Sequence, residues 1–191
     1  MNDPIAMLAR WIEDAGGAES LDAIAMCLAT ADAAAHPSAR MVLLRGLDAR
    51  GIAFYTSRLS RKGRELAENP HAAAVLYWPA LARQVRIEGD VTPLTDAESD
   101  AYFDARPRGH RIAAWASEQS EPLESYALLE ERFAHFDARF EGEEVPRPHS
   151  WGGYLLAPSQ VEFWQGRPNR MHDRVAYARS GNEWREIRLQ P

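Results

Sequence analysis

A short, strongly basic stretch stands out in a chain that is acidic overall. The protein has 191 residues and a formal net charge of −6. Residues 40–64 contain a single acid, Asp48, and seven cations: Arg40, Arg45, Arg50, Arg58, Arg61, Lys62 and Arg64. Clustered guanidinium groups suit phosphate, because their planar N–H donors match its oxygens. The stretch therefore indicates an anion site, with a solvated basic surface as the alternative.

Most other site chemistries have no support in the sequence. Lys62 is the only lysine and lies in this dense basic stretch, so we do not expect Schiff-base catalysis. Cys27 is the only cysteine, which excludes an internal disulfide and a cysteine-based zinc cluster. The six histidines never pair at metal spacing, so we expect no metal. Glycine-rich nucleotide loops and a nucleophile elbow are absent, and the net charge argues against nucleic-acid binding.

The composition is that of a globular protein. Hydrophobic residues make up 46% of the chain, enough for a substantial core. No apolar run has the length of a membrane span, and no leader-like segment opens the chain. We therefore expect a soluble, cytoplasmic protein with one domain over residues 1–191.

The elements around the basic stretch are predicted to be strands. A capped amphipathic helix is expected from Asp3-Pro4 to about residue 15. Strands are predicted at 24–30, 40–44 and 52–56, the last two forming a hairpin. Ser60 can cap a short helix, and two more strands are expected at 72–78 and 84–91.

The middle of the chain is predicted to be helical. Thr95 and Glu98 have capping-box spacing, and further helices are expected at 111–117 and 123–140. The remaining strands are predicted at 154–156, 161–164, 175–179 and 184–189. This order predicts an α+β fold with a mostly antiparallel sheet or barrel and a helical insertion at about 95–141.

Several separated motifs then carry a resemblance to a known family. The C-terminal part reads Val-Glu-Phe-Trp-Gln-Gly at 161–166, Arg-Met-His-Asp-Arg at 170–174 and Arg-Leu-Gln-Pro at 188–191. Further matching segments lie at 40–44, 54–56, 60–62, 83–85, 102–108, 115–120 and 151–153. From about residue 22 to the end, the chain resembles the pyridoxine/pyridoxamine 5′-phosphate oxidases. The resemblance implies an FMN-binding split β-barrel with flanking helices, in a homodimer with FMN at the subunit interface.

The resemblance also implies which residues bind the cofactor. The FMN phosphate would be held by Arg40, Arg61 and Lys62, with Gln119 and Ser120 nearby. The other implied FMN contacts are Met41, Val42, Leu43, Tyr55, Thr56, Gln84, Trp164 and Arg174. An arginine beside the flavin ring can stabilise the negative charge that reduction places there.

A second set of matches implies a site for a small phosphorylated pyridine. Its phosphate residues would be Tyr102 and Arg106, with Arg45 in place of the usual lysine and His110 in place of a common serine. Arg170 and His172 match residues placed over the pyridine ring, and on an extended segment their spacing predicts side chains on the same side. Arg170 is expected to orient the substrate. His172 is expected to assist as a hydrogen-bond partner or in proton removal.

The implied reaction is FMN-dependent oxidation of pyridoxamine and/or pyridoxine 5′-phosphate to pyridoxal 5′-phosphate, with dioxygen giving hydrogen peroxide. Arg45 and His110 motivate one alternative, a paralogous FMN-dependent oxidase with another substrate, such as a phenazine-type tailoring enzyme. Another alternative is a non-catalytic flavin- or pyridoxal-phosphate-binding protein. Asp22 matches an acid near the substrate, with a capping role as the alternative.

Overall fold

A computed structural model describes residues 3–17, 20–181 and 183–191. The strands are β1 (Ala25–Ala31), β2 (Pro37–Leu43), β3 (Gly46–Asp48), β4 (Gly51–Ser57), β5 (His71–Trp78), β6 (Arg83–Pro93), β7 (Trp151–Gln165), β8 (Asp173–Ser180) and β9 (Glu183–Leu189). The helices are α1 (Pro4–Asp14), α2 (Leu21–Ile24), α3 (Arg61–Glu68), α4 (Asp96–Asp104), α5 (Arg108–Ala116) and α6 (Tyr126–Arg139), with 3₁₀ turns η1 (Pro79–Leu81) and η2 (Pro168–Arg170).

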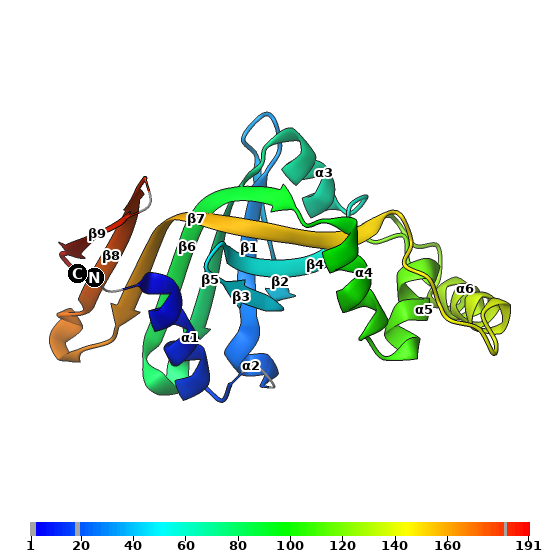
Figure 1. Ribbon diagram of the computed structural model, residues 1–191, viewed down its shortest axis with the longest axis horizontal. Helices are drawn as coiled ribbons and strands as arrows, with labels where there is room; N and C mark the ends of the chain where they lie inside the picture. Colours follow the sequence, from blue (N-terminus) through cyan, green and yellow to red (C-terminus); the bar gives the residue numbers. More distant parts are fainter. Residues whose placement is uncertain (1–2, 18–19, 182) are drawn as a thin grey trace.

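The strands form one curled sheet in the order β2-β1-β5-β6-β7-β4-β3, and β8 and β9 continue it from β7 (Figure 1). Every recorded pairing is antiparallel. The long strand β7 has β6 along one edge, while β4 and then β8 share the other edge. The predicted α+β fold with an antiparallel sheet is confirmed.

A β-bulge in β7 determines which of its residues face the core. β7 carries one extra residue, Ser159, where its pairing with β6 shifts between Glu88 and Gly89. The core-facing residues are even-numbered before the bulge and odd-numbered after it: Tyr154, Leu156, Val161 and Phe163. The two strands predicted at 154–156 and 161–164 are in fact a single strand. A bulge interrupts the alternation of buried residues without ending the strand.

The predicted hairpin between the strands at 40–44 and 52–56 is wrong. β2 begins earlier, at Pro37, and pairs with β1. The turn between β1 and β2 is held by Asp32, whose carboxylate accepts hydrogen bonds from the backbone N–H groups of Ala34 and His36. β4 pairs instead with β3, which was not predicted, and with β7. Pro37 is tolerated because β2 is the last strand on its side of the sheet.

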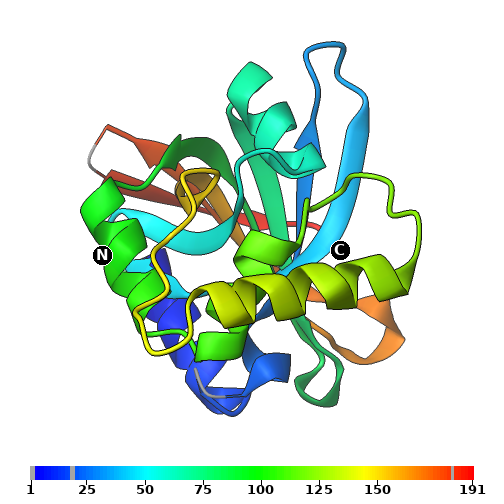
Figure 2. The same ribbon diagram turned by 90° about the vertical axis from the view of Figure 1, so that its right-hand side faces the viewer.

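The helices lie at three places around the sheet. α4, α5 and α6 gather at the end where β7 begins, α1 and α2 lie next to each other away from that end, and α3 packs against β1 (Figures 1 and 2). α4 has the predicted capping box between Thr95 and Glu98, and Asp3 caps α1. None of the helices in the described ranges is long and apolar enough to span a membrane.

Candidate active site

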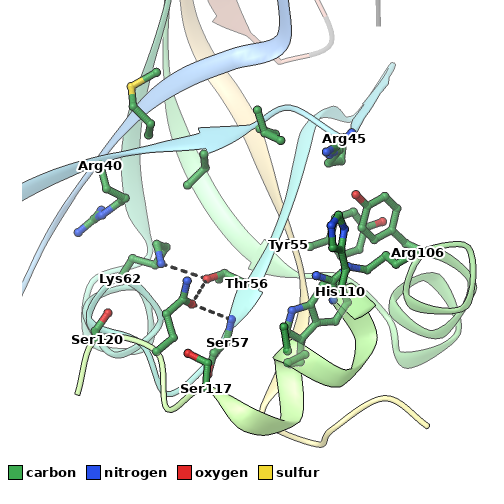
Figure 3. Close-up of a pocket in the computed structure, with 18 of the residues that line it drawn as sticks. Arg40, Arg45, Tyr55, Thr56, Ser57, Lys62, Arg106, His110, Ser117 and Ser120 are labelled. Atoms are coloured by element: carbon green, nitrogen blue, oxygen red, sulfur yellow. Dashed lines mark hydrogen bonds between the residues drawn. The ribbon is translucent and has the colours of Figure 1, made fainter. Parts of the chain in front are cut away.

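A cavity of about 1130 Å³ opens between β2, β4, the start of α3 and the helices α4 and α5 (Figure 3). It is lined by most of the residues that the sequence nominated: Arg40, Met41, Val42, Leu43, Arg45, Tyr55, Thr56, Arg61, Lys62, Tyr102, Arg106, His110, Gln119 and Ser120. Figure 3 shows two groups of basic side chains, with Arg40 and Lys62 in one and Arg45, Arg106 and His110 in the other. The cavity therefore offers two separate places for an anion.

Lys62 lies at the first of these two places, which we call the Lys62 end. Ser60 caps α3 by accepting a hydrogen bond from the Gly63 N–H, and this sets Lys62 in the first helical turn. Lys62 is only 5% exposed, and its Nζ donates to Thr56 Oγ1 at 3.0 Å and to Ser60 Oγ at 3.3 Å. Burial and the nearby charge of Arg40 lower its pKa to about 8, against a smaller opposing effect of Glu65.

Gln119 closes the same end from the loop after α5. Its Oε1 accepts hydrogen bonds from Thr56 Oγ1 at 2.8 Å and from the Ser57 N–H at 3.2 Å. Thr56 thus accepts from Lys62 and donates to Gln119, which orders three polar side chains in one row. Ser120 follows directly with a positive φ of 75°, an uncommon backbone conformation for a residue with a side chain.

The second place, which we call the Arg106 end, is built on stacked aromatic rings. Tyr102 stacks on Tyr55 with ring centroids 3.8 Å apart, and Trp151 continues the stack at 5.5 Å from Tyr55. The Arg106 guanidinium lies 4.7 Å from the Trp151 ring centroid. Its Nη1 is buried without a hydrogen-bond partner among the described residues. Burial lowers the pKa of Arg106, while Tyr102 raises it and Arg45 lowers it further.

Five nominated residues do not line this cavity: Gln84, Trp164, Arg170, His172 and Arg174. They lie near the C-terminal end of β7, in the turn that follows it and on the neighbouring strands β6 and β8. Gln84, Trp164 and Arg174 are paired neighbours across β6, β7 and β8. Arg174 Nε donates to the buried Glu162 carboxylate at 2.7 Å, and this contact raises the pKa of Arg174. The three side chains therefore form one row across the sheet.

His172 packs beside this row, with its ring centroid 4.7 Å from that of Trp164. The Arg167 backbone N–H donates to His172 Nδ1 at 3.2 Å. A neutral ring that accepts at Nδ1 carries its proton on Nε2, so His172 offers a donor there.

The expectation that Arg170 and His172 share one side of an extended segment is wrong. Arg170 lies in the 3₁₀ turn η2, where it has a positive φ of 61°, and strand β8 begins only at Asp173. Asn169 before it also has a positive φ, of 57°. Alternation of side chains applies to extended backbone and not to such a turn.

Sequence reasoning missed one charged residue below the Lys62 end. Glu65 is 5% exposed and forms ion pairs with Arg40 and Arg61. Its spacing of four residues from Arg61 on a helix was the available signal, but that spacing is typical of exposed pairs. Asp22 lies exposed in the first turn of α2 and does not line the cavity.

Comparison with known proteins matches both parts of the chain to one family, the family that the sequence motifs resemble. Residues 18–140 match the family described as pyridoxamine 5′-phosphate oxidase, and residues 151–191 match the pyridoxine 5′-phosphate oxidase C-terminal dimerisation region. The pyridoxine/pyridoxamine 5′-phosphate oxidase of Rubrobacter xylanophilus is 54% identical over 189 residues, covering 99% of this chain and 87% of the relative. The protein of the same name from Anaeromyxobacter dehalogenans is also 54% identical over 189 residues, covering 99% and 96%.

Two solved structures share the fold. PhzG from Burkholderia lata, crystallised with tetrahydrophenazine-1-carboxylic acid, has a TM-score of 0.93 at 36% identity and covers 100% of this chain and 94% of its own. A pyridoxamine 5′-phosphate oxidase-related, FMN-binding protein from Nostoc punctiforme has a TM-score of 0.73 at 20% identity, covering 98% and 95%. The fold is thus the split barrel predicted from the sequence. The family matches and the two relatives at 54% identity show that this chain belongs to the pyridoxamine 5′-phosphate oxidase family.

Proposed function

We propose that the protein is an FMN-dependent oxidase that converts pyridoxamine and/or pyridoxine 5′-phosphate to pyridoxal 5′-phosphate, with dioxygen as the electron acceptor. The observation that carries this proposal is one cavity with a cationic group at each of two ends. A cofactor with a phosphate and a substrate with a phosphate together require two such places.

The Lys62 end fits the phosphate of FMN. Lys62 is buried beside neutral oxygens, with the arginine charge of Arg40 close enough to lower its pKa. Such a crowded set of cations is relieved by a bound anion. Arg61 adds a guanidinium, and Gln119 orders Thr56, the hydroxyl to which Lys62 donates.

The Arg106 end fits the phosphate of the substrate. The buried, unpaired Nη1 of Arg106 is a donor that needs an acceptor, since an unsatisfied buried donor is costly. Tyr102 is fixed by its stacking on Tyr55, and Arg45 adds a second guanidinium to the lining. Arg45 and His110 keep donors at this end, although their shapes differ from those of the common lysine and serine.

The C-terminal residues would reach the cavity from a second copy of the chain. Trp151 lines the cavity at the start of β7, and Trp164 lies 13 residues further along the same strand. At roughly 3.3 Å per residue, this is a separation of up to about 40 Å. The matched dimerisation region at 151–191 supports a homodimer in which each site combines the cavity of one subunit with the row Gln84, Trp164 and Arg174 of the other.

The redox chemistry is what FMN would supply when bound: acceptance of a hydride from the 4′ carbon of the substrate, and transfer of electrons to dioxygen to give hydrogen peroxide. The chain would supply orientation and charge. Arg106, Tyr102 and Arg45 would hold the substrate phosphate. Arg170 would orient the ring, and His172 would donate a hydrogen bond from Nε2. Arg174 carries a fixed positive charge suited to the flavin edge.

A peroxide-coupled assay on FMN-loaded protein tests the proposal. Pyridoxamine 5′-phosphate and pyridoxine 5′-phosphate are compared with pyridoxamine, in wild type, Arg106→Met and the exposed control Arg10→Met. Loss of a charge-assisted contact of about 1.5–3 kcal/mol should raise KM for the phosphorylated substrate roughly 10- to 150-fold in Arg106→Met only. Absence of peroxide from the wild type with both phosphorylated vitamers would refute the proposal.

A second candidate function is oxidation of a phenazine precursor. It is favoured by the likeness to PhzG, which extends over the whole chain at 36% identity. The same assay with tetrahydrophenazine-1-carboxylic acid distinguishes the two. Faster turnover of this compound than of both phosphorylated vitamers would support the second candidate against the first.

A further inference from the structure

Below the Lys62 end, one buried carboxylate connects three elements. Glu65 of α3 accepts hydrogen bonds from Thr30 of β1 and from Ser38 of β2, the latter at 2.9 and 2.7 Å. It also forms ion pairs with Arg40 at 3.2 Å and with Arg61 at 2.8 Å. Only 6% of its side chain is exposed. Two strands and a helix are thus joined at one carboxylate.

The contacts of Glu65 fix the direction of both arginines. Arg61 uses its Nε for Glu65, which leaves the two terminal nitrogens at the far end of its guanidinium for a ligand. Both terminal nitrogens of Arg40 donate to the protein, to Leu28, Thr30, Ser38 and Glu65, so its guanidinium plane has little freedom and Nε is the donor left for a ligand. Arginine side chains carry considerable rotamer entropy, and a guanidinium that is already oriented loses less of it on binding an anion.

Burial disfavours the charge on Glu65, but the four hydrogen-bonding groups outweigh this effect and lower its pKa to about 2. The carboxylate is therefore ionised throughout the neutral range. It balances part of the positive charge of Arg40 and Arg61, which allows the two guanidinium groups to lie at one end of the cavity before any anion binds.

We infer that Glu65 is a positioning residue for the phosphate of the cofactor: it orients Arg40 and Arg61 at the Lys62 end without touching the ligand. This inference rests on the proposed FMN site. A negative charge behind the arginines also weakens the attraction for a phosphate, but it lies beyond two cations. We expect orientation of the donors to dominate, because charge-assisted hydrogen bonds depend strongly on geometry.

Comparison of FMN with riboflavin tests the inference, because riboflavin is the same flavin without the phosphate. Dissociation constants of both are measured by flavin fluorescence on cofactor-free wild type, Glu65→Gln and the control Glu68→Gln, an exposed acid on the same helix. Glu65→Gln should weaken FMN binding about tenfold and leave riboflavin binding unchanged. Glu68→Gln should change neither.

Each other outcome counts against the inference. Equal weakening of FMN and riboflavin would indicate a general structural role, and unchanged or tighter FMN binding would show that orientation does not dominate. A wild type that binds both flavins equally would refute the proposed phosphate site and the inference with it. If Glu65→Gln does not fold, Glu65→Asp gives the same test, because its carboxylate is drawn back from both arginines while the charge is kept.

Discussion

Raising the pH from 7 to 9 should weaken binding of FMN, because Lys62 loses its proton over this range in the cofactor-free protein. Its pKa there is lowered to about 8, first by burial and then by Arg40, with Glu65 opposing. A phosphate dianion beside Lys62 favours the protonated amine, so its pKa rises in the complex. Binding above pH 8 must therefore take up a proton, and affinity falls as protons become scarce.

The size of the effect follows from the lowered pKa. If Lys62 stays protonated in the complex, the dissociation constant of FMN is proportional to 1 + 10^(pH − 8). This factor is about 1.1 at pH 7 and about 11 at pH 9, a loss of roughly tenfold, or about 1.4 kcal/mol. The phosphate itself contributes nothing, since its second pKa of about 6 leaves it doubly charged at both pH values.

Fluorescence titration of FMN at pH 7, 8 and 9 measures the effect, and calorimetry in buffers of different ionisation enthalpy counts the protons taken up. Lys62→Arg is the matched control, because a guanidinium stays charged over the whole range. Its affinity should vary little between pH 7 and 9. Equal dissociation constants for the wild type at pH 7 and 9, or the same slope in Lys62→Arg, would refute the reasoning.

Three further outcomes are expected. The pKa of Glu65 is lowered to about 2 from 4.5, so its stabilising contribution of about 3 kcal/mol is present above pH 4.5 and is lost as the pH falls through 2. The free energies of unfolding of wild type and Glu65→Gln, measured with urea, should therefore converge as the pH falls from 4.5 to 2. A constant difference between them would contradict this. Gly51→Ala should destabilise the protein by about 2 kcal/mol or more, seen as a lower Tm, because a Cβ would lie 2.1 Å from the Leu156 carbonyl oxygen at a φ of +144°. Thr95→Ala should cost about 1 kcal/mol by removing the α4 capping box, while exposed Thr92→Ala should have little effect; equal losses would contradict the capping role.

Local signals in the sequence predicted much of the fold. The capping box at Thr95 and the cap at Ser60 placed the starts of two helices, because a cap depends on neighbours along the chain. The partner of a strand does not depend on neighbours in this way. β2 contacts β1 because Asp32 turns the chain between them, and alternation within the strand at 40–44 carries no information about its partner.

The site was predictable residue by residue, but its assembly was not. Resemblance nominated Lys62, Arg106 and Trp164 together, whereas the structure places the first two in one cavity and Trp164 far along β7. Glu65 remained hidden because its spacing from Arg61 is that of an ordinary surface pair. Its burial results from contacts with β1 and β2, which lie about 25 to 35 residues away in sequence.

The bulge at Ser159 has a consequence for insertions and deletions within the family. Two residues that are two positions apart, Pro158 and Gln160, pair with the adjacent Gly89 and Glu88 and so occupy opposite faces. A relative that lacks this extra residue would keep every side chain of β7 on its present face, with a straight ladder in place of the kink. A single-residue gap is therefore acceptable at this one place in β7. A gap at residue 161 or 162, with the bulge kept, would instead move Trp164 from its row into the core and Phe163 out of it.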